Sequence, residues 1–200
     1  SQAYYTINLC NLFIDGMAAK GTGVVGTTLS NNYLGEARLI RALSYYSLLQ
    51  LYARPFIDGA GNKPGLPLRL TGIKGSGYSD LARSTVAEVY TQILSDLNFS
   101  ETNLPLTNGA SAELNTTRAH RNTAIALKTR VYLTMGNYAS VVTEANKIVA
   151  QSVAPFSATS GVAHALQANI TNIFGAAPIY NTTESIFSLP MTSTAGDFPG

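Results

Sequence analysis

Apolar residues recur along the first part of the chain with the spacing of a helical face. Between Tyr4 and Met17 they fall at every third or fourth position, which predicts an amphipathic helix. From Tyr33 to Tyr52 they cover most of the helical circumference, with only a few polar interruptions. A helix that is apolar nearly all round is buried by neighbours on more than one side. The second segment is therefore expected to be an inner helix of a bundle or solenoid.

Two segments beside this inner helix lack apolar periodicity and are predicted to be loops. The stretch 18–32 is rich in Gly, Thr and Ser. Arg54-Pro55 ends the inner helix, because the residue before a proline is pushed out of the α region. The stretch 54–80 then carries many glycines and several prolines. Long loops inside compact domains are uncommon and often functional, so a binding site is expected here first.

A third helix follows the long loop. Ser84 is placed as its N-cap, with Glu88 close to the position of a capping box, and the helix is expected to end near Phe99. Leu104-Pro105 and Asn108-Gly109 are typical of the loop that comes next.

The following two helices are predicted to form a hairpin. They run from about Thr117 to Met135 and from Tyr138 to Gln151, with only Gly136-Asn137 between them. So short a break forces the two helices to lie antiparallel. Small residues on both helices allow a close approach, as in a tetratricopeptide (TPR) repeat.

The final segment, 151–200, is weakly patterned, and one short strand is predicted around residues 186–189. Strands and helices do not alternate along the chain, which argues against a parallel α/β sheet. The predicted fold class is therefore all-α. We expect one domain over 1–200, with TPR-like helical hairpins over 1–150 and an irregular remainder.

Charged residues make up 12% of the chain, about half the usual share, and the net charge is +2. Amides and hydroxyls fill the gap, and such a surface suits hydrogen bonding to neutral polar ligands. Lys and Arg are scattered and form no run. Nucleic-acid binding requires a basic patch or stripe, so no nucleic-acid partner is expected.

Residues that could hold a cofactor or a metal are isolated. The stretch 21–26 matches GxGxxG, but a helix precedes it and a loop follows, so no dinucleotide site is predicted. His120 and His164 each stand alone, without a second ligand at metal spacing. His120, at a helix start, is expected to be solvated or to cap the helix. Cys10 is expected to be a small buried residue. We predict no cofactor and no catalytic residue.

Four helical segments carry ordered motifs. They are EARLIRALSYYSLLQLY over 36–52, STVAEVYTQILSDL over 84–97, AIALKTRVYLTMGNYASVVTEANKI over 124–148, and the Tyr4 to Asn11 helix before them. Together they resemble the helices of the SusD/RagB family in order and spacing, over about 4–150. One departure is Ala53-Arg54, which stands where a lone glycine usually precedes the proline.

The resemblance implies a lipid-anchored nutrient-binding protein on the outer surface of a Bacteroidetes-type bacterium. Such proteins bind oligosaccharides, or peptides in some members, and deliver them to a SusC-like TonB-dependent transporter without catalysis. Family members are commonly longer, so this chain is expected to be a fragment whose anchor cysteine lies outside it. Loops 18–32 and 54–80 are expected to contribute to ligand or transporter contact.

Aromatic residues are the natural candidates for a sugar site, because an apolar sugar face can lie on an aromatic ring. The chain has no Trp and 11 Tyr. By their position on helical faces, the tyrosines expected in the core are Tyr45, Tyr46, Tyr90 and Tyr132. Tyr4, Tyr33 and Tyr78 lie near predicted loops and are the candidate ligand-binding residues. Asn8 is added because its amide can bond sugar hydroxyls.

The sequence is also compatible with two other function classes. A TPR-type scaffold would bind a peptide or protein in its concave groove. A hydrolase would require dispersed acidic residues that meet only in the fold. Saccharide binding distinguishes nutrient capture from the first, and substrate turnover would identify the second.

Overall fold

The computed structural model describes residues 2–75, 77, 80–173 and 181–190, and this part of the chain is helical. The longer helices are α1 (Gln2–Gly16), α3 (Thr27–Tyr52), α4 (Val86–Asn103), α6 (Arg121–Thr134) and α7 (Tyr138–Ala145). The short elements are the π-helical turn η1 (Met17–Gly21), α2 (Thr22–Val25), α5 (Leu114–Thr117) and the 3₁₀ turn η2 (Ile170–Asn172). The all-α, TPR-like prediction is confirmed.

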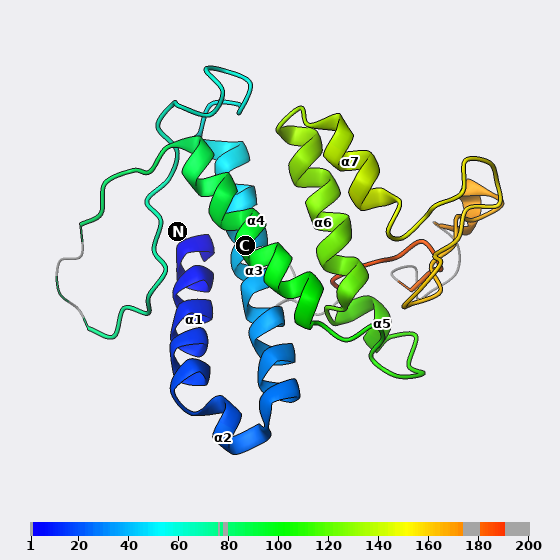
Figure 1. Cartoon of the computed structure of the whole chain (residues 1–200), viewed down its shortest axis with the longest axis horizontal. Helices are drawn as coiled ribbons and strands as arrows, with labels where there is room; N and C mark the ends of the chain where they lie inside the picture. The colour runs from blue at the N-terminus through cyan, green and yellow to red at the C-terminus, as the bar shows by residue number, and fades with distance from the viewer. Residues whose placement is uncertain (1, 76, 78–79, 174–180, 191–200) are drawn as a thin grey trace.

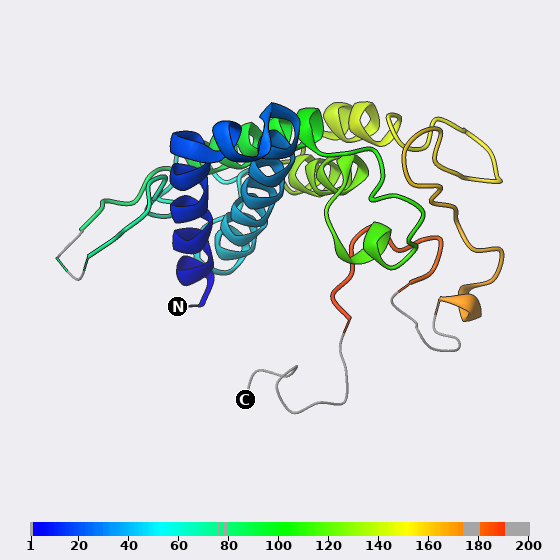
Figure 2. The ribbon, with the colours of Figure 1, turned by 90° about the horizontal axis from the view of Figure 1, so that it is seen from below.

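The helices pack in chain order as successive antiparallel neighbours. α1 lies beside α3, α3 packs on α4, α4 on α6, and α6 pairs with α7 (Figure 1). Seen from below, they form a curved row, and α5 and the described residues 181–190 lie on one side of it (Figure 2). The long loop between α3 and α4 extends from the α1 end of the row (Figure 1). The segment after α7 occupies the other end.

The core is centred on α4. Ile93 and Leu97 of this helix have no exposed surface, nor do Ile7 of α1 and Tyr45 of α3. Full burial of such side chains contributes roughly 1.5–3 kcal/mol each. The tyrosines predicted in the core are buried at Tyr45, Tyr46 and Tyr90 and half-buried at Tyr132. Cys10 is also buried, as predicted.

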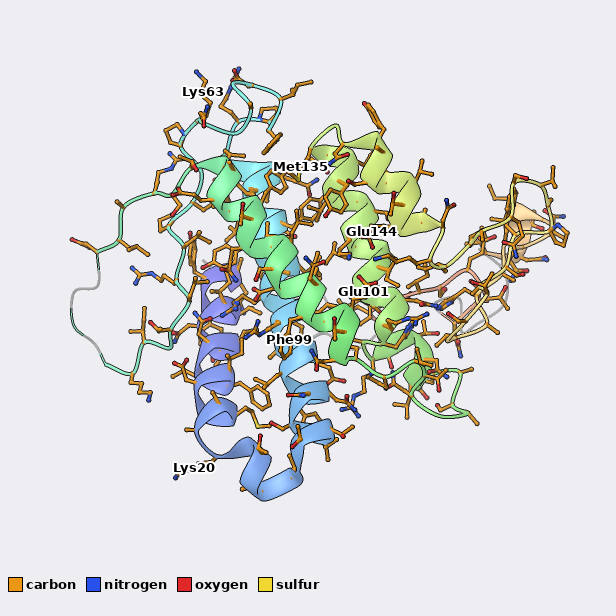
Figure 3. All side chains as sticks on the ribbon, in the orientation of Figure 1. Lys20, Lys63, Phe99, Glu101, Met135 and Glu144 are labelled. Carbon is orange, nitrogen blue, oxygen red and sulfur yellow. The ribbon has the colours of Figure 1, made fainter. Side chains whose placement is uncertain are left out.

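A cluster of two lysines and two glutamates joins α4 to the hairpin. Lys128 of α6 is buried, and its Nζ lies against Glu101 of α4 and 3.0 Å from Glu144 of α7. Lys147 Nζ lies 2.9 Å from Glu101 and 2.8 Å from Glu144. Figure 3 labels both glutamates, one on α4 and one on α7. The cluster fixes how the hairpin sits on α4.

The segment 18–32, predicted to be a loop, is helical instead. η1, α2 and the first turns of α3 continue the chain from α1, interrupted only at Gly26, whose φ is 80°. Gly21 packs so closely that an added Cβ would lie 2.5 Å from Met17 Cε and 2.9 Å from Ser30 Oγ. Gly21 allows a close approach between helices, and Gly26 allows a sharp turn of the chain. The loop predicted here from composition is therefore wrong.

The third helix begins one residue later than predicted. Thr85 is the N-cap: its hydroxyl accepts from the Glu88 N–H at 3.2 Å, and its own N–H donates to the Glu88 carboxylate at 2.7 Å. Ser84 is held extended, because its N–H donates to the Leu66 carbonyl and its carbonyl accepts from the Gly65 N–H. The helix continues to Asn103, beyond the predicted end.

The hairpin is present, with shorter helices than predicted. α6 begins at Arg121 and not at Thr117, because Arg118 and His120 are extended. α7 ends at Ala145, before the predicted Gln151. Gly136, with φ 75°, makes the reversal, and the Asn137 side chain caps α7 by accepting from the Ser140 N–H at 3.1 Å. The predicted turn is therefore confirmed.

The short strand predicted at 186–189 is wrong. The Ser188 N–H donates to the carbonyl of Thr116 at 2.9 Å, so this segment attaches to the end of α5 and not to another strand. In the part of the chain that the structure describes, extended pairing is limited to two isolated bridges. None of the described helices is long and apolar enough to cross a membrane.

Candidate functional site

One face of α1 carries polar side chains that hold the long loop. Residues spaced four, three and four apart share a face of an α-helix. On α1 this spacing gives the stripe Tyr4, Asn8, Asn11 and Asp15. All four bond to the backbone of the loop segment 67–73. We call this stripe the loop clamp.

The pairing of Asn8 with the loop is reciprocal. Its Nδ2 donates to the Ile73 carbonyl at 3.3 Å, and its Oδ1 accepts from the Ile73 N–H at 2.7 Å. Farther along the same face, the Gly72 N–H donates to Asp15 Oδ2 at 2.8 Å. A Cβ on Gly72 would lie 2.6 Å from Leu12 Cδ2 and 3.0 Å from its Cα. Only a glycine lets the loop lie this close to α1.

Tyr4 of the loop clamp and Tyr45 of α3 hold the loop together. The Tyr4 hydroxyl donates to the Pro67 carbonyl at 3.0 Å, and its ring meets that of Tyr45 edge-on at 6.3 Å. The Tyr45 hydroxyl donates to the Arg69 carbonyl at 2.8 Å and accepts from the Arg69 N–H at 2.7 Å. Burial raises the pKa of Tyr45 to about 12 and also raises that of Tyr4. Both phenols stay neutral and hold the loop at physiological pH.

Tyr4 and Asn8, two of the predicted ligand-binding residues, therefore meet at the loop with their polar groups engaged by its backbone. Tyr78, a third, lies outside the described residues. Tyr33 lies elsewhere, on the groove between α1 and α3. The sequence spacing of the loop clamp could have identified it, because its 4-3-4 pattern is visible without a structure.

The groove between α1 and α3 is an open hollow of about 430 Å³. Its lining is mainly apolar, with two aromatic rings and two polar side chains: Thr6, Leu9, Cys10, Phe13, Tyr33, Glu36, Ala37 and Ile40. Leu9, Phe13 and Ile40 are 47%, 43% and 40% exposed. Burial raises the pKa of the Cys10 thiol, which keeps it protonated. The groove thus offers aromatic surface to solvent beside a carboxylate and a hydroxyl.

Arg118, which is distant in sequence, contacts two residues that line the groove, Glu36 and Tyr33. Its Nε donates to Glu36 Oε1 at 2.6 Å and its Nη2 to Oε2 at 3.3 Å. Its guanidinium also lies 5.8 Å from the centre of the Tyr33 ring. The hydrogen bond with Glu36 raises the pKa of Arg118, so the guanidinium stays charged. Sequence reasoning missed this residue, since 82 positions separate it from Glu36.

The two histidines are not isolated as predicted. His120, at the N-cap of α6, has no exposed surface, and its ring stacks on that of His164 with centroids 5.3 Å apart. The expected capping position is correct, and the expected solvation is wrong. Among the described residues, no three metal-binding side chains gather at one point.

The first two thirds of the sequence match a known family. The SusD-like family model described as "Starch-binding associating with outer membrane" matches residues 1–133. The family model covers more than half of the chain, so the chain belongs to this SusD-like family. No protein with a curated description matches the chain.

Solved structures agree with this assignment. A SusD superfamily protein from Bacteroides fragilis is 31% identical to this chain, with a TM-score of 0.77. The match covers 99% of this chain and 41% of the Bacteroides fragilis protein. A SusD superfamily protein from Bacteroides thetaiotaomicron is 26% identical, with a TM-score of 0.65 and coverages of 72% and 30%. A SusD-like carbohydrate binding protein from Bacteroides vulgatus, 23% identical, has a TM-score of 0.63 and coverages of 75% and 30%. The chain spans less than half the length of each.

Proposed function

We propose that this chain is part of a non-catalytic, cell-surface protein that captures oligosaccharides. The match of residues 1–133 to a starch-binding family is the observation that carries the proposal. The low share of charged residues, 12%, agrees with a neutral polar ligand.

The α1–α3 groove is the proposed site of capture. Tyr33 and Phe13 supply rings on which the apolar face of a sugar can lie. Glu36 and Thr6 stand beside them as hydrogen-bonding groups for sugar hydroxyls. Arg118 fixes the Glu36 carboxylate before a ligand arrives, and a preorganised group loses less entropy on binding.

The loop 54–80 supplies a second surface, and the loop clamp determines its position. Tyr4 and Asn8 act here as positioning residues, because their polar groups hold the loop backbone. Tyr78 belongs to this loop and remains a proposed ligand contact. The clamp holds residues 67–73 of the loop against α1.

The proposed partner is a SusC-like TonB-dependent transporter that receives the captured ligand. The proposed location is the outer face of the outer membrane, with a lipid anchor outside this chain. The family description, which names association with the outer membrane, supports the proposed membrane, and the resemblance to the SusD/RagB family supports the transporter and the anchor.

A second candidate, capture of a peptide or protein segment, is favoured by the same groove. Leu9, Phe13 and Ile40 leave apolar surface exposed along its length. Partially exposed aliphatic and aromatic side chains in a row are typical of grooves that bind an amphipathic segment.

A matched pair of tyrosine variants tests the proposed site. Tyr33→Ala removes a ring from the groove, and Tyr138→Ala removes a ring that is 68% exposed on α7. Loss of one stacking ring is expected to weaken oligosaccharide binding about tenfold or more. We expect this loss in Tyr33→Ala alone. Retention of peptides with no saccharide bound on an array would instead support the second candidate.

A further inference from the structure

A second hollow lies at the other end of the molecule from α1. It is a cavity of about 400 Å³ between three segments: 107–116, which includes α5, 161–164 and 181–185. α5 and the segment after α7 lie at the opposite side of Figure 1 from α1. The volume falls in the range of small-molecule sites, roughly 300–1,000 Å³. The cavity is therefore separate from the α1–α3 groove.

The walls of this cavity are built to hold their shape. The Asn115 side chain joins both ends of a turn: its Oδ1 accepts from the Asn108 N–H at 2.6 Å, and its Nδ2 donates to the Gly109 carbonyl at 2.8 Å. Thr183 holds another wall: its carbonyl accepts from the Ala165 N–H at 3.0 Å, and its hydroxyl donates to the Ala165 carbonyl at 2.9 Å. These bonds form before any ligand binds.

Gly161 brings the third wall into place. Its φ is 80°, and an added Cβ would lie 3.1 Å from the Leu106 carbonyl oxygen and 3.2 Å from Asn122 Nδ2. A positive φ favours glycine, and an added Cβ would crowd the Leu106 carbonyl oxygen. The wall thus lies against the Leu106 backbone, which directly precedes the 107–116 segment, and against the Asn122 side chain of α6.

The described lining of the cavity carries no charged side chain. It consists of hydroxyl, amide and small apolar residues with a single histidine, His164. Burial lowers the pKa of His164, which therefore stays neutral at physiological pH. An ionic ligand would lose hydration here and meet no opposite charge, which is costly. A neutral ligand with many hydroxyls would exchange its bonds to water for bonds to the walls.

One polar atom of a residue that lines the cavity has no hydrogen-bond partner among the described residues. His164 is 7% exposed, and its Nε2 is buried without a partner among the described residues. Asn181 accepts from the Thr116 hydroxyl at 3.0 Å through Oδ1, and its side chain lines the same cavity. Buried polar groups in native proteins are nearly always paired, so an unpaired one beside a cavity points to a ligand.

We infer that this cavity is a second saccharide subsite, which takes a neutral sugar ring and excludes charged sugars. The inference rests on the proposed function and adds a place and a selectivity to it. Asn181 Nδ2 and the exposed Thr107 hydroxyl donate to ring hydroxyls, and His164 Nε2 serves as the buried partner. The groove and the cavity then bind two parts of one chain of sugars or two separate molecules.

Titration calorimetry of the 200-residue chain with maltose, and with glucuronic acid as the charged probe, tests the inference. Asn181→Ala and Thr107→Ala each remove a hydrogen-bonding group, and Asn146→Ala is the matched control on an exposed site after α7. In a Tyr33→Ala background, which leaves only the cavity, we expect maltose to bind and glucuronic acid not to. Either cavity variant should weaken that binding about tenfold, and the control should leave it unchanged.

The ¹⁵N chemical shift of His164 Nε2 is measured on the unmodified chain, so this test does not depend on whether a variant folds. We expect it to move on addition of maltose, with the ring neutral before and after. Maltose binding that is lost in Tyr33→Ala and unaffected by both cavity variants would overturn the subsite while supporting the groove. Equal binding of glucuronic acid would overturn the selectivity. Absence of any saccharide binding to the unmodified chain would overturn the proposed function as well.

Discussion

The guanidinium of Arg41 makes two hydrogen bonds to the carboxylate of Asp96, from Nε at 2.8 Å and from Nη2 at 2.7 Å. Arg41 is 4% exposed and Asp96 is fully buried, so α3 and α4 are joined by a paired charge inside the core. Arg41 Nη1 also donates to Asn11 Oδ1 at 2.7 Å, and Asn11 Nδ2 donates to the Arg69 carbonyl at 2.8 Å. One bonded chain thus runs from α4 through α3 and α1 to the long loop.

Removal of one partner of this pair is expected to destabilise the fold strongly. Asp96→Ala leaves the Arg41 guanidinium buried without its counter-charge, which costs about 3–5 kcal/mol of unfolding free energy. Urea denaturation followed by circular dichroism measures the change. Asp58→Asn is the control, because Asp58 pairs with Arg54 on the surface and its loss should leave the unfolding midpoint nearly unchanged. Equal midpoints for the two variants would contradict the account.

The position of the long loop is expected to depend on Gly72. Gly72→Ala places a Cβ 2.6 Å from Leu12 Cδ2, so the loop must move away from α1. We expect a loss of about 1–3 kcal/mol and faster proteolysis within 54–80. Gly75→Ala is the matched control, since a Cβ at Gly75 meets nothing within 4 Å. Identical cleavage rates in the two variants would show that the clamp does not hold the loop.

Stability is expected to fall as the pH is lowered from 7 toward 4. Burial lowers the pKa of His120 from 6.5 to about 4, so the unfolded chain binds a proton that the folded chain does not. The stabilisation is fully present above pH 6.5 and is lost as the pH falls through the folded value, about 3 kcal/mol in all. The nearby His164, whose pKa is also lowered, adds to the same trend.

His120→Asn tests this pH dependence directly. Asparagine retains a polar residue at the N-cap and does not titrate. The unfolding free energy of this variant, measured between pH 7 and pH 5, should fall less steeply than that of the parent chain. A slope equal to that of the parent would assign the pH dependence to other groups.

The ion cluster at the hairpin should respond unequally to loss of its two lysines. Lys128→Met removes a cation that is 97% buried between Glu101 and Glu144, and about 3 kcal/mol of stability should be lost, since the carboxylates lose their buried partner. The Lys147 side chain is 38% exposed, so Lys147→Met should lower the free energy of unfolding by less than about 1 kcal/mol. Lys20→Met, at an exposed position far from the cluster (Figure 3), is the control. A larger effect from Lys147 than from Lys128 would contradict this ranking.

The features that follow local rules could be predicted from the sequence. Tyr45 and Tyr90 lie on apolar helical faces and are buried, and Gly136 ends a helix where its positive φ allows a tight turn. The error at 18–32 has a different origin, because Gly21 is required by contact with Ser30 and not by a loop. Close approach between helices is a tertiary property, and composition does not distinguish it from flexibility.

The candidate site was less predictable, because side chains distant in sequence form it. Tyr33 was selected for its ring, but Arg118, which holds its neighbour Glu36, comes from a separate helix boundary. Asn8 was selected for its amide, and that amide holds Ile73 of the loop. The stacking of His120 on His164 likewise depends on where the segment after α7 returns to α6. Contacts between side chains that are distant in sequence depend on the tertiary fold, which local sequence patterns do not give.

Calorimetric titration of the 200-residue chain with a starch oligosaccharide tests the central claim most directly. We expect a saturable heat of binding, with an affinity that Tyr33→Ala reduces about tenfold and Tyr138→Ala leaves unchanged. We also expect the oligosaccharide to be recovered intact after prolonged incubation. Absence of binding to the unmodified chain, or shortening of the oligosaccharide during incubation, would contradict non-catalytic capture.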